Sequence, residues 1–220
     1  MILSDKPLIR AFNTDCMEIL KATSENFYDL AIVDPPYGIG EDGKKNHSRG
    51  KLAKAKKYTP KSWDKAKPSP SYFTELRRVS KNQIIWGGNY YGLNATPCYI
   101  VWDKDNTGDF ADCELAWTSF KTAVRKFTWR WNGMLQQNMK DKDVRIHPTQ
   151  KPVALYRWLL KNYAKAGQKI LDTHGGSFSS AVACHTEGYD LDIMEIDKDY
   201  FDNGVKRFKI ETSQLKLFDN

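Results

Sequence analysis

The chain has 220 residues, 40% of them hydrophobic and 13% aromatic, which is enough for one well-buried core and a modest insertion. No stretch approaches the roughly 18 consecutive apolar residues of a membrane span, and the charge at Asp5 comes too early for a signal peptide, so we expect a soluble intracellular protein. The four cysteines are scattered and form no CxxC pair, which favours reduced thiols over disulfides or structural zinc.

Apolar, β-branched stretches alternate with helical segments along the chain, which indicates an α/β sheet layered by helices. Strands are expected at 8–12, 30–33, 83–86, 99–102, 114–117, 169–171 and 191–196. Helices are expected at 16–21, 71–79, 152–164, 177–187 and 198–210. Aromatic residues alternate with polar ones over 124–131, which suggests additional antiparallel strands. We therefore predict a mixed, mostly parallel sheet with helices on both faces.

The positive charge of the chain is concentrated in one segment. Residues 38–68 contain ten lysines or arginines against three acidic residues, so this segment accounts for the whole net charge of +7. It lacks apolar periodicity, and a loop of about thirty residues inside a compact domain is normally either functional or disordered. A basic segment of this kind attracts polyanions.

Asp34-Pro35-Pro36-Tyr37 directly follows the apolar run 30–33, at the end of the strand where open α/β folds bind ligands. The prolines fix the backbone of this loop. The Asp34 carboxylate and the Pro35 carbonyl are acceptors that suit an aromatic amine, whose nitrogen becomes nucleophilic when it turns tetrahedral, and Tyr37 can stack on an extruded base. The alternative for these four residues is a rigid turn after a strand.

Two further blocks flank this loop. Residues 13–20, Asn-Thr-Asp-Cys-Met-Glu-Ile-Leu, precede it, and 147–152, His-Pro-Thr-Gln-Lys-Pro, lead into a helix and then into Ile170-Leu171-Asp172. This succession resembles the permuted, beta-class amino-methyltransferases of DNA, in which the catalytic motif precedes the cofactor motif, and the resemblance covers nearly the whole chain. It implies a Rossmann-like fold that binds S-adenosylmethionine, in a bacterial or phage-infected cell.

The resemblance also implies a cofactor site. Asp15 and Cys16 belong to the block near the cofactor adenine, and Lys151 is expected at its methionine carboxylate. The cofactor loop of the family corresponds to Asp172, His174, Gly176 and Ser177, and Glu195 ends the next strand, where an acidic residue can hold the ribose hydroxyls. The alternatives are a helix N-cap for Asp15 and a solvated loop lysine for Lys151.

The cofactor motif departs from the family pattern at two places. His174 replaces an aromatic residue, and Phe178 stands where the family has glycine, so that its ring either crowds the cofactor or packs beneath it. A nicotinamide dehydrogenase is a poorer match, since it needs a G-x-G-x-x-G turn near the first strand and has no use for Asp34-Pro35-Pro36-Tyr37. His174, Cys184 and His185 match no zinc spacing, so no metal is expected.

DNA is the expected substrate, with the target base flipped out of the duplex. The basic segment 38–68 begins at the catalytic loop and is expected to grip phosphates through Lys44, Lys45, Arg49, Lys51, Lys54, Lys56 and Lys57, although a solvated, disordered loop has the same composition. Only this segment and 120–146 are free for target recognition, which favours a short or relaxed target sequence. Asp at the first catalytic position favours adenine N6 within the resemblance. Cytosine N4 or RNA methylation and a cofactor-defective nucleic-acid binder remain alternatives.

We expect one methyltransferase domain over 1–220 with a tail at 212–220. Near its end, Gln214, Leu215, Leu217 and Phe218 resemble the pentapeptide by which bacterial proteins dock on the replicative sliding clamp. An extended tail can insert two apolar side chains into a pocket of such a partner. The alternative is a tail that packs on the chain's own sheet.

Overall fold

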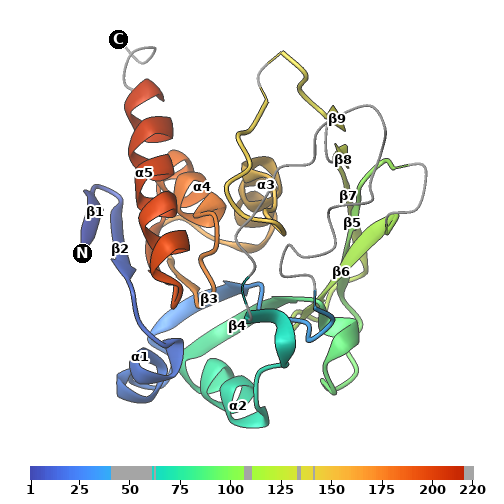
Figure 1. The fold of residues 1–220 in the computed structure, drawn as a ribbon. Coiled ribbons are helices and arrows are strands. Elements are labelled where there is room, and N and C mark those ends of the chain that lie inside the picture. Colours follow the sequence, from blue (N-terminus) through green and yellow to red (C-terminus); the bar gives the residue numbers. More distant parts are fainter. Residues whose placement is uncertain (41–60, 62, 107–110, 133–134, 141, 216–220) are drawn as a thin grey trace.

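The computed structural model describes residues 1–40, 61, 63–106, 111–132, 135–140 and 142–215. A nine-stranded sheet runs through it in the order β1-β2-β11-β10-β3-β4-β6-β5-β7 (Figure 1). Its strands are β1 (Ile2–Asp5), β2 (Leu8–Phe12), β3 (Tyr28–Val33), β4 (Ser80–Trp86), β5 (Tyr99–Asp103), β6 (Cys113–Thr118), β7 (Arg125–Thr128), β10 (Lys169–Asp172) and β11 (Asp190–Met194). The short strands β8 (Trp131–Asn132) and β9 (Leu135–Gln136) form a separate antiparallel ribbon.

Helices cover both faces of the sheet (Figure 1). They are α1 (Cys16–Ala22), α2 (Pro70–Val79), α3 (Val153–Tyr163), α4 (Ser179–Glu187) and α5 (Lys198–Leu215), with 3-10 turns η2 (Trp63–Lys65) and η3 (Gly88–Tyr90). Strand β3 shows how the layers form, because successive side chains of a strand point to opposite faces. Leu30 and Ile32 pack with α3, α4 and α5, whereas Ala31 and Val33 pack with α1 and α2. The predicted mixed, mostly parallel α/β sheet is confirmed.

The parallel strands place the candidate functional loops together. Strands β2, β11, β10, β3 and β4 are neighbours in the sheet and run parallel. Their carboxyl ends therefore lie along one edge, which is where Asp34 follows β3, Gly87 follows β4, and the glycine-containing loop follows β10. Residues far apart in the sequence reach one site in this way.

The aromatic segment 124–131 differs from expectation. Its strand β7 pairs parallel with β5, not antiparallel, and only β8 enters an antiparallel ribbon. The reason is the connection through β6, which pairs antiparallel with both β4 and β5. The chain reverses at β6 and reverses again before β7, so β7 runs in the direction of β5.

The carboxyl-terminal helix is longer than the sequence pattern indicated. Helix α5 continues to Leu215, so the first residues of the expected tail 212–220 are helical. Thr212 donates its hydroxyl to the Phe208 carbonyl at 2.8 Å, and an i,i+4 ion pair between Arg207 and Glu211 precedes it. Neither Gly nor Pro interrupts 205–215. Residues 216–220 lie outside the described part. Within the described residues, no helix combines the length and apolar character needed to cross a bilayer.

Candidate active site

The candidate catalytic loop, residues 34–37, is a rigid corner at the end of β3. The Tyr91 hydroxyl donates to the carbonyls of Pro35 at 2.7 Å and Pro36 at 3.0 Å, so the loop is held from the side of η3. The Tyr37 ring stacks on Tyr90 with 4.9 Å between ring centroids and 16° between planes. Two prolines, one tyrosine hydroxyl and one ring stack thus fix the orientation of the loop.

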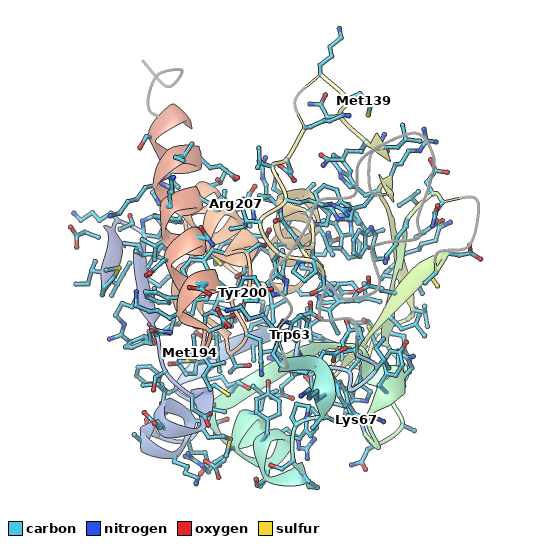
Figure 2. The ribbon with its side chains drawn as sticks, viewed as in Figure 1. Trp63, Lys67, Met139, Met194, Tyr200 and Arg207 are labelled. Atoms are coloured by element: carbon cyan, nitrogen blue, oxygen red, sulfur yellow. The ribbon has the colours of Figure 1, made fainter. Side chains whose placement is uncertain are left out.

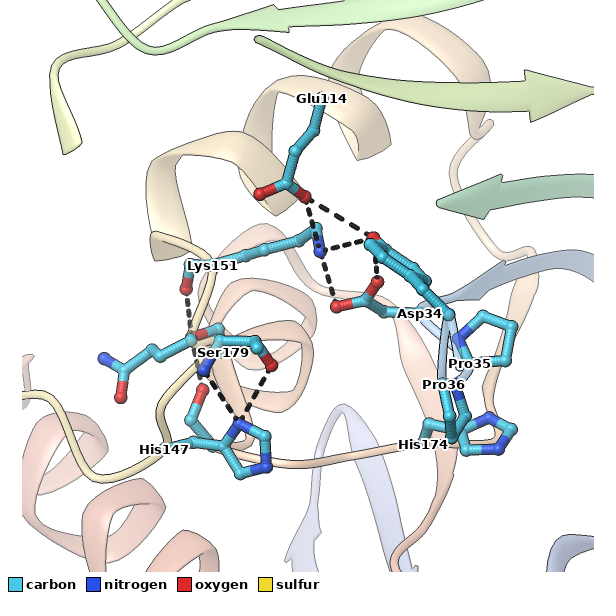
Figure 3. A network of polar contacts seen from close by, with 12 residues as sticks. Asp34, Pro35, Pro36, Glu114, His147, Lys151, His174 and Ser179 are labelled. Atoms are coloured by element: carbon cyan, nitrogen blue, oxygen red, sulfur yellow. Dashed lines mark hydrogen bonds and ion pairs between the residues drawn. The ribbon is translucent and has the colours of Figure 1, made fainter. Parts of the chain in front are cut away.

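Asp34 accepts a hydrogen bond on each carboxylate oxygen (Figure 3). The Tyr37 hydroxyl donates to Oδ1 at 2.7 Å, and the Lys151 ammonium donates to Oδ2 at 2.5 Å. Each oxygen of an ionised carboxylate has a second acceptor site. Burial raises the pKa of Asp34, and Lys151 opposes that rise. The carboxylate is therefore oriented by two partners and still has acceptor capacity.

Lys151 places its ammonium beside the Asp34 carboxylate. Its ammonium contacts Asp34 and, at 3.0 Å, Oε2 of Glu114 in β6, and its side chain is only 3% exposed. The solvated-loop alternative does not describe so buried a side chain. The ammonium lies against Asp34, and the expected contact of Lys151 with the methionine carboxylate of a cofactor stays a prediction. Glu114 was missed by sequence analysis, although a charged residue in the apolar run 114–117 was a usable signal.

The loop after β10 approaches the catalytic loop because β10 and β3 are adjacent parallel strands. Asp172 is buried and accepts from the Ser180 hydroxyl at 2.5 Å and the His174 amide at 3.0 Å. Burial raises the pKa of Asp172 to about 7. The His174 ring shares a hydrogen bond with the Thr173 hydroxyl and packs edge-on against Tyr72. Burial lowers the pKa of His174 to about 4. Asp172 therefore connects the end of β10 to the start of α4 through its hydrogen bonds.

Glu195 closes the same loop from β11. One of its carboxylate oxygens accepts the Gly176 amide at 2.8 Å, and the other accepts the Asp197 amide at 2.8 Å. Gly176 has a φ of 50°, which glycine adopts at little cost, and Ser177 beside it is buried. The acidic residue at the end of the second strand and the glycine turn of the first are thus joined directly.

Phe178 packs beneath the loop. It is fully buried, its φ is 61°, and its ring meets Phe201 of α5 edge-on with 5.8 Å between centroids. The ring lies in the core between Gly175 of the turn and Gly204 of α5. Of the two arrangements left open by the sequence, crowding of a ligand and packing below it, the structure has the second.

Asp15 and Cys16 begin α1 at the same edge of the sheet. The Asp15 carboxylate accepts the Met17 amide at 2.9 Å, as expected of an N-cap, and the rest of Asp15 is exposed. Cys16 is half-buried, and burial together with the Asp15 charge raises the pKa of its thiol to about 12. The capping role of Asp15 is therefore present, and a cofactor role for either residue stays a proposal.

The described ends of the basic segment are anchored near this site. Asp64 accepts the Gly38 amide at 2.8 Å, which ties the two ends together. Lys61 forms ion pairs with Asp197 and Asp199 beyond β11. The His147 ring lies against both Trp63 and Tyr200, two residues that Figure 2 labels. The expected phosphate contacts lie outside the described residues: Lys44, Lys45, Arg49, Lys51, Lys54, Lys56 and Lys57.

The structure therefore brings together most of the site residues expected from the sequence and adds Glu114, Tyr90 and Tyr91. The tyrosines follow β4 and its Gly87-Gly88 turn. Sequence analysis missed them, although their place just after an expected strand, at the edge where open α/β sheets bind ligands, was a usable signal. Among the described residues, no group of three or more His, Cys, Asp or Glu side chains is arranged to hold a metal ion.

Comparisons with known proteins agree with this geometry. A protein-family model described as DNA methylase, for N6 and N4 enzymes, matches residues 94–206. The chain is 23% identical to the type II methyltransferase M.HinfI of Haemophilus influenzae, over 89% of this chain and 67% of the relative. Among solved structures, M1.HpyAVI in its complex with SAM has a TM-score of 0.57 at 20% identity, covering 90% of this chain and 99% of the other. The cytosine-N4-specific PvuII DNA methyltransferase has a TM-score of 0.55 at 11% identity, covering 96% and 95%. The two structures share the fold of this chain.

Proposed function

The chain belongs to the DNA methylase family, and from that premise we propose that it transfers the methyl group of S-adenosylmethionine to N6 of a flipped-out adenine in DNA. The observation that carries the proposal is the adjacency of two loops. The Asp34 and Pro35 acceptors end β3, and the glycine turn with Glu195 ends β10 and β11 beside it. An amine acceptor pair next to a nucleoside-binding turn is what amine methylation requires.

The residues of the turn suit this cofactor. Gly176 lets the backbone approach a ligand closely, and the Glu195 oxygens have acceptor sites left for ribose hydroxyls after binding two amides. The ring of Phe178 raised the alternative of a cofactor-defective binder, and its burial beneath the loop supports cofactor binding. Asp15, Cys16, His174 and Ser177 are proposed to line the rest of the site. When bound, S-adenosylmethionine supplies an electrophilic methyl group.

The chain's own residues are proposed to activate the amine. The Asp34 carboxylate and the Pro35 carbonyl each accept a hydrogen bond from the amine, which favours the tetrahedral nitrogen and frees its lone pair for attack on the methyl carbon. The bond from that carbon to sulfur breaks as the bond to nitrogen forms, the electron pair stays on sulfur, and the amine then releases one proton. The negative charge of Asp34 stabilises the positive charge that develops on that nitrogen. Tyr37 is proposed to contact the base, and a base that stacks on the face now covered by Tyr90 has to displace that ring.

We propose adenine and not cytosine as the target base because Asp at position 34 favours adenine N6 within the resemblance. Cytosine N4 methylation stays the alternative because the fold is also similar to that of a cytosine-N4-specific enzyme. The decisive experiment incubates the chain with labelled S-adenosylmethionine and DNA or RNA, then identifies the methylated nucleoside by mass spectrometry. N6-methyladenine from DNA is expected. N4-methylcytosine or a methylated ribonucleoside would replace the proposal by one of the alternatives, and DNA binding without any product would identify a binder.

Asp34→Ala is the negative control of that assay. By analogy with removal of one preorganised hydrogen-bonding group, it should slow transfer on the order of a hundredfold to a thousandfold. Binding of labelled S-adenosylmethionine, measured in parallel, should stay near that of the wild type. Normal turnover of the variant would remove Asp34 from the mechanism.

Two further elements of the proposal concern partners. The basic segment 38–68 is proposed to bind DNA phosphates in a bacterial or phage-infected cell, with 120–146 as a small target-recognition region. Clamp docking through Gln214, Leu215, Leu217 and Phe218 requires an extended peptide, whereas Gln214 and Leu215 belong to α5, so the last helical turn has to unwind. A sliding-clamp pull-down that is unaffected by Phe218→Ala would end this part of the proposal.

A further inference from the structure

Four charged side chains of alternating sign form a line that ends at Asp34. The Lys151 ammonium lies 2.5 Å from Oδ2 of Asp34 and 3.0 Å from Oε2 of Glu114 (Figure 3). The second Glu114 oxygen, Oε1, pairs with the Lys104 ammonium at 2.5 Å. Four separate segments supply these groups, namely the residues after β3, those after β5, strand β6 and the loop before α3, and together the four side chains carry no net charge. Such an arrangement stabilises buried charges only when each has an opposite partner.

A simple pair of Asp34 and Lys151 would not serve amine methylation well. An ammonium bound to one carboxylate cancels most of its charge, whereas the transition state needs negative charge beside the amine nitrogen. Glu114 changes this balance because it binds the same ammonium. With the charge of Lys151 divided between two carboxylates, Asp34 keeps part of its negative potential.

The protonation behaviour of the two carboxylates agrees with this division. Burial raises the pKa of Glu114, but Lys151 and Lys104 outweigh it and lower that pKa to about 2. Glu114 is therefore a permanent anion. Burial raises the pKa of Asp34, Lys151 lowers it, and Glu114 raises it again, so the Asp34 carboxylate responds to any change in the other two groups.

We propose that Lys151 and Glu114 are positioning residues of the methyl-transfer step. Lys151 fixes the orientation of the Asp34 carboxylate, and Glu114 shares the ammonium so that Asp34 keeps negative charge for the target amine. This inference rests on the proposed function, in which Asp34 accepts a hydrogen of the target amine.

Glu114→Gln tests the sharing of charge. The amide keeps the shape of the side chain and an acceptor oxygen, but it leaves Lys151 to pair with Asp34 alone. We expect kcat to fall on the order of tenfold, while KM for DNA and the dissociation constant for S-adenosylmethionine change by less than about threefold. A changed cofactor affinity with unchanged kcat would overturn the inference and return Lys151 to the cofactor carboxylate.

Lys151→Met and Lys151→Arg test the second residue through the pH profile of kcat. In Lys151→Met the cation is lost, which raises the pKa of Asp34 further, so the acidic limb of the pH profile of kcat should move to higher pH. Lys151→Arg keeps the cation, so its acidic limb should return to the wild-type pH. Other titratable groups affected by the Asp34 charge are Tyr37, Tyr72, Tyr91, Tyr156 and Asp172. Burial raises the pKa of all four tyrosines, which therefore stay neutral, and Asp172 titrates in every variant.

A double variant separates the inference from a merely structural ion network. If Glu114 acts through Lys151, Glu114→Gln should cause no further loss of kcat in the Lys151→Met background, because no shared cation remains. An equal loss in both backgrounds would overturn the inference.

Should Lys151→Met fail to fold, Glu114→Gln and Lys151→Arg still test the inference, because an unchanged kcat of Glu114→Gln refutes the sharing of charge. A wild type without methyl transfer contradicts the proposed function, whereas an active wild type with a fully active Glu114→Gln contradicts only this inference.

Discussion

The ring of Phe178 lies directly against the backbone of Gly204 in α5: a Cβ atom at position 204 would be 2.5 Å from Cδ1 of Phe178. Phe178 has a left-handed backbone, which costs a residue with a side chain about 1 to 2 kcal/mol relative to glycine. The cost is offset by burial of the ring in the space that Gly204 leaves open. Gly204 in α5 therefore makes a phenylalanine acceptable in the loop after β10.

Gly204→Ala should destabilise the fold although alanine favours a helix interior. The gain in helix propensity is about 1 kcal/mol, and overpacking of a filled core costs about 1 to 3 kcal/mol. The net loss should be on the order of 1 kcal/mol by urea unfolding. Gly92→Ala, at a position with nothing within 4 Å of its Cβ, is the control. In a Phe178→Ala background, Gly204→Ala should become stabilising because the ring no longer fills the space. A Gly204→Ala single variant that is more stable than the wild type would contradict the packing of Phe178 against Gly204.

The same pair shows how far the sequence could predict this molecule. The strand ends were predictable because apolar runs stop abruptly, as at Val33 before Asp34, and parallel strands bring such ends to one edge. The direction of the Phe178 ring could not be predicted, since it depends on free space that Gly204 supplies in another helix. For the same reason the sequence could not indicate that Lys151 meets Glu114, whose strand β6 joins the site through antiparallel pairing.

Gly87→Ala should impair catalysis by displacing Tyr37. A Cβ atom at position 87 would lie 2.2 Å from Cε1 of Tyr37, so the ring has to move together with its hydroxyl, which donates to Asp34. A shift of about 1 Å in a catalytic group costs on the order of a hundredfold in rate, which single-turnover methyl transfer would measure. Alanine at this φ of 69° also costs about 1 to 2 kcal/mol of stability.

Gly167→Ala is the matched control for this backbone cost. Its φ is 81° and nothing lies within 4 Å of its Cβ, so it should lose similar stability and keep the wild-type transfer rate. Equal rates for the two variants would show that the position of Tyr37 does not limit catalysis.

Asp172 should make the fold more stable at acidic pH than at neutral pH. Burial raises its pKa from 3.8 to about 7, so the folded state holds a proton that the unfolded state has released. The stabilisation is complete below the unfolded pKa and is lost as the pH rises from about 4 through about 7, with a total on the order of a few kcal/mol.

Asp172→Asn removes this titration and keeps an acceptor for the Ser180 hydroxyl. Urea unfolding at several pH values should show the stability of the variant gaining on that of the wild type between pH 4 and 7. The exposed carboxylate of Asp202, replaced by Asn, is the control, because its surface pair with Lys198 is worth less than about 1 kcal/mol. Parallel pH curves for Asp172→Asn and the wild type would refute the raised pKa of Asp172.

The location of the positive charge, more than its amount, should determine DNA binding. Replacing Lys44, Lys45, Lys51 and Lys54 with Gln should reduce the slope of log Kd against log salt by about 0.9 for each lost phosphate contact, and leave S-adenosylmethionine binding unchanged. The control replaces four exposed lysines of α3, the loop after it and α5, namely Lys161, Lys165, Lys206 and Lys209, and removes the same charge. If both sets flatten the slope equally, net charge alone attracts DNA, and the segment beside the catalytic loop has no special part in holding the duplex from which the base is flipped.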